Sequence, residues 1–367
     1  MFSCLEICQN EWEVEMTNDR DDNNKPILEI DKIFFSYSKD EKILSNLSLN
    51  VNKGEFVSIL GDSGAGKTSL LRVINGLEKI EEGYIRLEGQ LLSSAFYHIS
   101  PEKRSVGTIF QDFALFPHLN VKENIYFGLN KKDKYDETFV EHIINLLRVE
   151  KYLNRYVDEL SGGQKQRVSL ARSLVRKPKL LLMDEPFSNL DRGLRVEIRR
   201  EIKMILKNID TTVILITHDS EEALSLSDKI GFILSGEIIQ YGTPFDIFYD
   251  PKNEIIAKAI RNSNILEGEI SNGIINTEIG KFKSHSKFKD KNKVKINVYP
   301  NQLGIVRDNK QFTIIQKEFV DGDYLYIIEN SDNKFIVRMN NSEEFYLNEL
   351  VGVVIKDTNV QIINISL

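Results

Sequence analysis

The chain has almost no cysteine. Among its 367 residues there are two, Cys4 and Cys8, which are too few for a disulfide framework and have no histidine at metal-ligand spacing beside them. We therefore expect both thiols to be reduced and structurally idle. The acidic leader that carries them, residues 1–26, resembles neither a secretory signal nor an arginine-rich transit peptide. Its polar composition predicts disorder, and Met16 is an alternative start.

Long apolar runs are also missing. The longest, around 180–183 and 213–216, fall far short of the roughly 18–20 residues that span a bilayer. We therefore expect a cytoplasmic protein whose role at a membrane, if it has one, runs through a partner. Basic charge is not in excess either, because 48 Lys and Arg face 55 Asp and Glu, a net charge of −7. This balance predicts no nucleic-acid partner.

The chain does contain a glycine-rich loop between an apolar strand, residues 56–60, and a helix, residues 69–76. We call it the phosphate loop; it reads Gly61-Asp62-Ser63-Gly64-Ala65-Gly66-Lys67-Thr68. Glycines let backbone N–H groups converge on phosphate oxygens at the start of a helix. Lys67 is expected to reach the β- and γ-phosphates, and the Thr68 hydroxyl to bind Mg²⁺. A turn that merely connects strand and helix is the alternative.

Polar residues end three further apolar strands. Asp184 and Glu185 follow residues 180–183, and successive strand residues point to opposite faces, so the two acids can serve different partners. We expect Asp184 to hold Mg²⁺ and Glu185 to accept a proton from an attacking water. His218 follows residues 212–217 and is a candidate γ-phosphate contact, and Gln111 follows residues 106–110. Solvated surface positions are the alternative for each.

Two other features are weak by themselves. The segment Leu160-Ser161-Gly162-Gly163-Gln164, here the LSGGQ segment, precedes a helix and is expected to make an anion-binding helix start. The alternative, which is the more common case, is a helix N-cap that binds no ligand. Tyr37, expected in a polar turn between two of the short strands at 27–30, 33–37 and 43–51, can stack on a purine or pack on the core. Pro101 to Arg104 is expected to form another polar turn.

The length and the pattern predict two domains. A helical block at about 112–177 interrupts an α/β region at 27–250, a linker covers 251–262, and residues 263–367 show short strands that suggest a small barrel. The strands are expected at 265–270, 274–279, 294–299, 312–315, 324–328, 335–339, 351–355 and 360–365.

Taken in order, Lys67-Thr68, Gln111, the LSGGQ segment, residues 180–185, Ser188 to Asp191 and His218 resemble the ATP-binding cassette (ABC) ATPases. The resemblance implies an α/β P-loop NTPase fold with an inserted helical subdomain, and a head-to-tail homodimer that sandwiches two ATP molecules with Mg²⁺. Asn189 departs from the alanine frequent there, and Thr68-Ser69 reverses the usual Ser-Thr order.

The same resemblance implies a role for each motif residue. The nucleotide is held by Tyr37 at the adenine, by the phosphate loop with Ser69, and by Ser161, Gly162, Gly163 and Gln164 of the partner copy. Glu185 is the general base, His218 binds the γ-phosphate, Gln111 senses Mg²⁺ and water, Asp184 supports the metal, and Asp191 couples the two sites.

The C-terminal layout and residues 110–119 resemble the ATPase subunits of bacterial solute importers that carry an OB-like (TOBE) domain. This implies a peripheral subunit on the cytoplasmic side of the plasma membrane, with a permease docked through the segment after Gln111 and a periplasmic solute-binding protein as an indirect partner. The compact C-terminal region and the Pro101 to Arg104 stretch look most like the ferric-iron importers, which implies ferric iron as the solute. Polyamine, sulfate, thiamine and sugar importers are the alternatives, and a soluble non-transport ABC ATPase is the rival.

Overall fold

A computed structural model describes residues 25–38, 41–127, 129, 135–283, 293–340 and 343–363. Cys4, Cys8, Met16 and most of the leader lie outside these residues. In the described part of the chain, no helix combines the length and the hydropathy that a membrane span needs.

A six-stranded sheet in the order β10-β9-β3-β8-β7-β6 forms the centre of the N-terminal part. Its strands are β3 (Phe56–Leu60), β6 (Val106–Ile109), β7 (Leu180–Asp184), β8 (Thr212–Thr217), β9 (Lys229–Leu234) and β10 (Glu237–Gly242). All neighbours are parallel except β10, which runs antiparallel to β9. Because parallel strands end at the same edge, the loops after β3, β6, β7 and β8 meet there.

Both faces of this sheet are covered, which explains why its strands are apolar throughout. Alternate residues divide between the faces: Leu180 and Leu182 of β7 belong to the core with α1 (Lys67–Asn75). Leu181 and Met183 belong to the core with α4 (Gly162–Leu174) and α5 (Arg192–Asn208).

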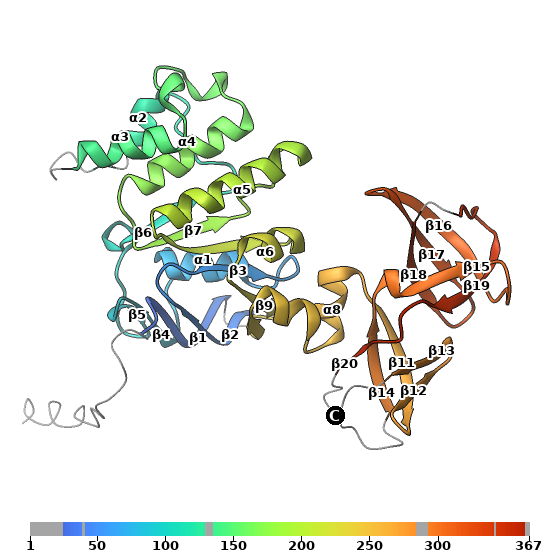
Figure 1. Ribbon diagram of the computed structural model, residues 1–367. Coiled ribbons are helices and arrows are strands. Elements are labelled where there is room, and N and C mark those ends of the chain that lie inside the picture. Colours follow the sequence, from blue (N-terminus) through green and yellow to red (C-terminus); the bar gives the residue numbers. More distant parts are fainter. Residues whose placement is uncertain are drawn as a thin grey trace, which may run out of the picture.

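An antiparallel sheet, β2-β1-β4-β5, covers the α1 side (Figure 1). Its strands are β1 (Leu28–Ser38), β2 (Glu41–Val51), β4 (Glu82–Leu87) and β5 (Gln90–Ser94). The two short strands expected at 27–30 and 33–37 are therefore one continuous strand. Tyr37 lies in β1 and not in a turn, since β1 pairs with β2 as far as Ser38 opposite Glu41.

The helical block contains α2 (Val121–Phe127), α3 (Glu137–Leu146) and α4, and it stands to one side of the sheet (Figure 1). Beyond β8 come α6 (Ser220–Leu226), α7 (Pro244–Tyr249) and α8 (Glu254–Arg261). Helix α8 occupies most of the expected linker and buries Ile256, Ala257 and Ile260. Short 3₁₀ turns lie at Pro101–Lys103, Glu150–Tyr152, Val157–Glu159 and Pro300–Gln302.

The C-terminal part is all β, as expected, and places two five-stranded sheets over one hydrophobic core. One sheet contains β13 (Gly280–Lys283), β12 (Ile274–Thr277), β11 (Asn264–Ser271), β14 (Lys293–Val298) and β20 (Gln361–Ile363). The other contains β15 (Leu303–Val306), β19 (Leu350–Ile355), β16 (Phe312–Val320), β17 (Asp323–Glu329) and β18 (Lys334–Asn340). Strands β13 and β15 were not predicted.

Candidate functional site

The phosphate loop joins β3 to α1 at the carboxyl edge of the sheet. Gly66 caps α1 with a φ of 101°, a left-handed conformation that residues with a Cβ rarely adopt. No side chain caps this helix and its first turn carries no acid. Its first N–H groups and the positive end of its dipole therefore suit an anion.

Lys67 is the cation of this loop. Its side chain is buried, and Nζ donates hydrogen bonds to the carbonyl oxygens of Gly61 and Asp62, both at 2.7 Å. Burial lowers the pKa of Lys67, while the neighbouring carboxylates of Glu185, Asp62 and Asp184 act in the opposite direction. The loop thus holds its lysine ready for a more highly charged acceptor, such as a phosphate oxygen.

A cavity of about 570 Å³ opens over the loop. It is lined by Glu41, Ile43, Ser63, Gly64, Gly66, Lys67, Thr68, Ser69, Glu185 and His218. The structure thus brings the ends of β7 and β8 to the phosphate loop, although the three segments are far apart in the sequence. We call this space the phosphate cavity.

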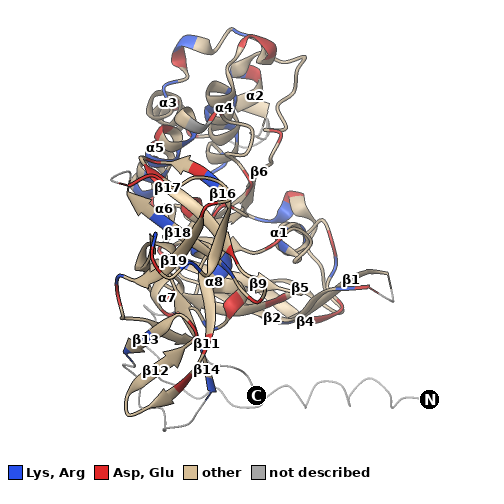
Figure 2. Cartoon of the chain, turned by 90° about the vertical axis from the view of Figure 1, so that its right-hand side faces the viewer, with Lys and Arg blue, Asp and Glu red and all other residues tan. Residues whose placement is uncertain are grey.

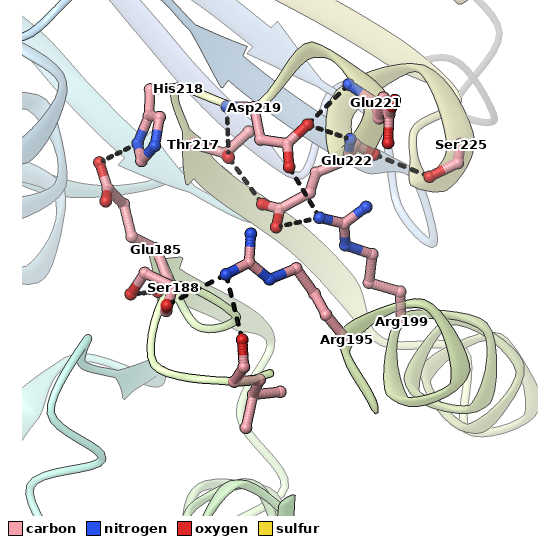
Figure 3. A network of polar contacts seen from close by, with 11 residues as sticks. Glu185, Ser188, Arg195, Arg199, Thr217, His218, Asp219, Glu221, Glu222 and Ser225 are labelled. Carbon is pink, nitrogen blue, oxygen red and sulfur yellow. Dashed lines mark hydrogen bonds and ion pairs between the residues drawn. The ribbon is translucent and has the colours of Figure 1, made fainter. Parts of the chain in front are cut away.

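The sequence predicts Asp184 and Glu185 as successive residues of one strand that point to opposite faces. In the structure Glu185 does not continue that strand. Strand β7 ends at Asp184, and Glu185 has a φ of 42°, an uncommon left-handed conformation for a residue with a side chain. The turn places Oε1 of Glu185 3.0 Å from Nδ1 of His218 (Figure 3). The candidate base and the candidate γ-phosphate contact are therefore direct neighbours.

Asp184 ends β7 and lies close enough to Lys67 and Glu185 to interact with their charges, although it does not line the phosphate cavity. Burial raises the pKa of its carboxyl, the nearby Glu185 raises it further, and Lys67 lowers it. The described residues contain no cluster of three or more His, Cys, Asp or Glu that could hold a metal. Mg²⁺ needs no such cage, since it is usually held by one or two protein groups, water and substrate phosphates. The half-buried Asp184 carboxyl and the exposed Thr68 hydroxyl fit that requirement.

Gln111 and Tyr37 lie outside the lining of the phosphate cavity. Gln111 is exposed just beyond β6, and its backbone carbonyl accepts a hydrogen bond from Nδ2 of Asn189 at 2.8 Å. Tyr37 is 55% exposed, packs edge-on against Phe35, and its hydroxyl accepts a long hydrogen bond, 3.4 Å, from Ser69. A half-exposed ring next to the loop is available for stacking.

The LSGGQ segment lies elsewhere. Ser161 caps α4 in a capping box with Gln164, whose Oε1 accepts from the Ser161 N–H at 2.9 Å. The second cavity, about 380 Å³, is lined by Arg148, Glu150, Lys151, Tyr152, Ser161, Gly163, Gln164, Arg167, Leu194 and Ile198. It shares no lining residue with the phosphate cavity. Within one chain, Ser161 and Gly163 are thus not part of the site around Lys67.

Helix α5 begins beside the LSGGQ segment, and its residues Leu194 and Ile198 line the second cavity. Asp191, at its N-cap, is exposed and makes no capping hydrogen bond through its side chain. A Cβ on Gly163 would lie 2.7 Å from Cδ1 of Ile198 and 3.2 Å from Cδ2 of Leu194. The glycine therefore lets α4 and α5 approach closely at the LSGGQ segment.

Sequence reasoning missed two buried arginines. Arg104, expected in a polar turn, is 3% exposed, and its guanidinium donates to the carbonyls of Val73 and Ile74 at 2.9 and 2.7 Å. It thereby satisfies carbonyls in the last turn of α1. Arg199 of α5 is also buried and pairs with Asp219 and Glu222 (Figure 3). The sequence around Arg199 reads as an ordinary charged helix, and it gave no sign that Arg199 is buried, because its partners, Asp219 and Glu222, follow β8.

Comparison with known proteins identifies the source of these motifs. The family model described as ABC transporter matches residues 44–188. The spermidine/putrescine import ATP-binding protein PotA of Clostridium novyi is 40% identical over 319 residues, covering 85% of this chain and 90% of that protein. The Fe(3+) ions import ATP-binding protein FbpC of Fusobacterium nucleatum is 43% identical over 289 residues, or 77% and 76% of the two chains.

Solved structures agree with this match. CbiO1 from Clostridium perfringens, part of the ABC transporter complex cbiONQ, superimposes with a TM-score of 0.55 at 27% identity and covers 61% of this chain and 90% of that one. A dimeric ATP-binding cassette in a post-hydrolysis state, bound to ADP and Pi, gives a TM-score of 0.50 at 27% identity, with 59% and 98% covered.

Proposed function

The chain belongs to the ABC transporter family and is the ATP-binding subunit of an importer; from this premise we propose that two copies join head to tail around two ATP molecules. The separation of the two cavities carries the proposal, because Ser161 and Gly163 line one and Lys67 lines the other. A second copy would bring its LSGGQ segment to the phosphate cavity of the first. The dimeric cassette with ADP and Pi supports this arrangement.

In each site the phosphate loop and Ser69 bind the phosphates, and Tyr37 stacks on the adenine. Lys67 exchanges its two carbonyl partners for phosphate oxygens. Thr68 and Asp184 would hold Mg²⁺, and Gln111 would sense it together with the attacking water. Mg²⁺ neutralises phosphate charge when bound.

Glu185 accepts the proton of the attacking water, and His218 holds Glu185 in place and donates to the γ-phosphate. The contact of 3.0 Å between the two side chains supports this pairing. Glu185→Gln is expected to lower kcat by about 10²–10⁴-fold while ATP still binds. Measurement of turnover together with nucleotide titration tests the role, and wild-type turnover in this variant would contradict it.

A membrane permease docks on residues 113–119. Phe113 and Ala114 both have positive φ values, and their carbonyls accept hydrogen bonds from Arg172 at 3.1 and 2.7 Å. Since Arg172 belongs to α4, the docking segment is fixed to the helix that begins at the LSGGQ segment. Half-buried Leu115, Phe116 and Leu119 supply the apolar surface.

This assignment places the subunit peripherally on the cytoplasmic side of the plasma membrane, with a periplasmic solute-binding protein as an indirect partner. For the solute we propose a cation. Ferric iron is the candidate from the sequence, and the name of the Fusobacterium relative supports it. Spermidine or putrescine is the second candidate, which the name of the Clostridium relative favours.

Mixing two inactive variants tests the composite site. Lys67→Ala disables the phosphate cavity and Ser161→Arg disables the LSGGQ segment. In a homodimer of either variant, both composite sites are therefore defective. A mixed dimer regains one site with both halves intact. Single-turnover hydrolysis that appears upon mixing supports the proposal. Two variants that stay inactive when mixed, beside an active wild type, would show that each chain builds its site alone.

Uptake measurements distinguish the solutes. Cells that express this chain with the permease subunits that copurify with it are expected to accumulate labelled ferric iron or spermidine, and cells with Glu185→Gln are not. Uptake of sulfate, thiamine or a sugar instead would contradict a cationic solute. Capture of ribosomes with no permease would favour the soluble, non-transport ATPase.

A further inference from the structure

Two arginines on α5, one helical turn apart, reach the two loops that carry the candidate base and its histidine (Figure 3). Nη2 of Arg195 donates to the carbonyls of Ser188 and Leu190, at 3.2 and 3.1 Å. The hydroxyl of Ser188 donates in turn to the carbonyl of Glu185 at 2.8 Å. The turn that holds Glu185 in its left-handed conformation is therefore tied to α5.

The second arginine holds the loop after β8. Nη2 of Arg199 lies 2.7 Å from carboxylate oxygens of both Asp219 and Glu222. Thr217 donates its hydroxyl to Glu222 at 2.6 Å and accepts the N–H of Asp219 at 3.0 Å. Both neighbours of His218 in the chain are thus fixed by hydrogen bonds from one buried ion cluster.

Burying the charged side chains of this cluster costs desolvation free energy that an apolar core would not. Arg199 is 6% exposed and Glu222 is 3% exposed. Burial raises the pKa of Glu222, which is a sign that its charged form is poorly accommodated there. Buried ion pairs are often no more stabilising than apolar residues of the same volume. Stability by itself therefore does not account for the cluster.

We propose that Arg195 and Arg199 are positioning residues for ATP hydrolysis, acting through Glu185 and His218 respectively. Helix α5 serves as a common support that keeps the two side chains in contact. The inference rests on the proposed roles of Glu185 and His218. Neither arginine lines the phosphate cavity, so neither is expected to contribute to nucleotide affinity.

The test uses the full chain and a double-mutant cycle. Arg199→Met is expected to lower kcat about 10–100-fold, as misplacement of a reacting group does, with the Kd for ATP changed less than about twofold. In a His218→Ala background the same change is expected to alter kcat by less than about twofold, because the group it positions is gone. Arg199→Lys is expected to recover part of the activity.

Arg338→Met is the matched control. It removes an arginine whose Nε lies 2.8 Å from Asp323 in the C-terminal part, and it should leave kcat unchanged. If Arg199→Met does not fold, Thr217→Val, which removes one hydroxyl from the cluster, takes its place in the same cycle.

Equal losses of kcat in the wild-type and His218→Ala backgrounds would overturn the inference, as would unchanged kcat in folded Arg199→Met. Absence of hydrolysis in the wild-type chain would instead overturn the proposed function. The two failures are therefore distinguishable.

Discussion

The two parts of the molecule treat charge differently. Among the described residues up to 262, four charged side chains are buried: Lys67, Arg104, Arg199 and Glu222. Among the described residues from 263 onward, the buried polar side chains are all neutral: Ser263, Asn264, Asn297 and Gln302. Acidic and basic residues occur along the chain in both parts (Figure 2), and both parts have exposed ion pairs, such as Lys177 with Asp136 and Arg307 with Glu343. The difference is therefore one of burial.

The difference shows where phosphate chemistry can be built. Buried charge costs free energy unless it is paired and hydrogen-bonded. The N-terminal part accepts that cost for Lys67, Arg199 and Glu222 around the phosphate cavity and its supports, and for Arg104 at the last turn of α1. The C-terminal sheets instead alternate apolar and polar residues and form ion pairs at the surface, such as Arg307 with Glu343 and Lys317 with Glu344.

Removing the buried lysine is expected to have the largest effect of four changes that test this comparison. Lys67→Ala should weaken ATP binding by about 100-fold or more, because charge-assisted hydrogen bonds to phosphate contribute about 3 kcal/mol. Since burial disfavours the charged form of Lys67, the unliganded variant should be no less stable than the wild type. Titration with a fluorescent ATP analogue and a thermal melt measure both; unchanged affinity would remove the lysine from the binding site.

Arg104→Met should have the next largest effect, and on stability. The variant removes the arginine donor from the carbonyls of Ile74 and Val73, of which Val73 keeps only the N–H of Gly76 at 3.2 Å. It also removes the donor from the carbonyl of Ile99, and each unsatisfied group costs about 1–3 kcal/mol. We expect the free energy of unfolding to fall by at least about 2 kcal/mol in urea titrations. A loss no larger than that of a surface variant would mean that water replaces the guanidinium.

Asp184→Asn should raise the free energy of unfolding. The gain should be smaller than the loss expected for Arg104→Met. The pKa of Asp184 is raised above its usual 3.8 in the fold, so between 3.8 and the raised value the folded protein binds more protons than the unfolded chain. Wild-type stability therefore falls as pH rises through that window and stays lower above it. Asparagine cannot ionise, so its advantage should vanish below about pH 3.8. Thermal melts across pH check this, and a variant less stable at pH 7 would contradict it.

Arg338→Met should have the smallest effect. The ion pair with Asp323 is more than a third exposed on both sides, and such pairs contribute about 0–1 kcal/mol. Urea titration at low and high salt should show a small loss that shrinks with salt. A loss as large as that of Arg104→Met would end the contrast between the two parts.

Much of the catalytic part was predictable, because its signals are local. A glycine loop between strand and helix, acids and a histidine at strand ends, and a capped helix are each encoded within about ten residues. The comparisons confirm the family, the fold class and the ATPase activity predicted from them. The roles of individual site residues stay predictions. The unpredicted strands β13 and β15 and helix α8 are short, and their tertiary partners stabilise them more than their own pattern does.

The sequence by itself determined which residues could bind a phosphate chain and which family arranges them in this order. The tertiary structure decided three other things. It turned Glu185 out of its strand toward His218, buried Arg104 and Arg199 against distant partners, and kept Ser161 away from Lys67. Each of these depends on contacts between segments far apart in the chain, which follow from the order of strands in the sheet and leave no mark on any short stretch of sequence.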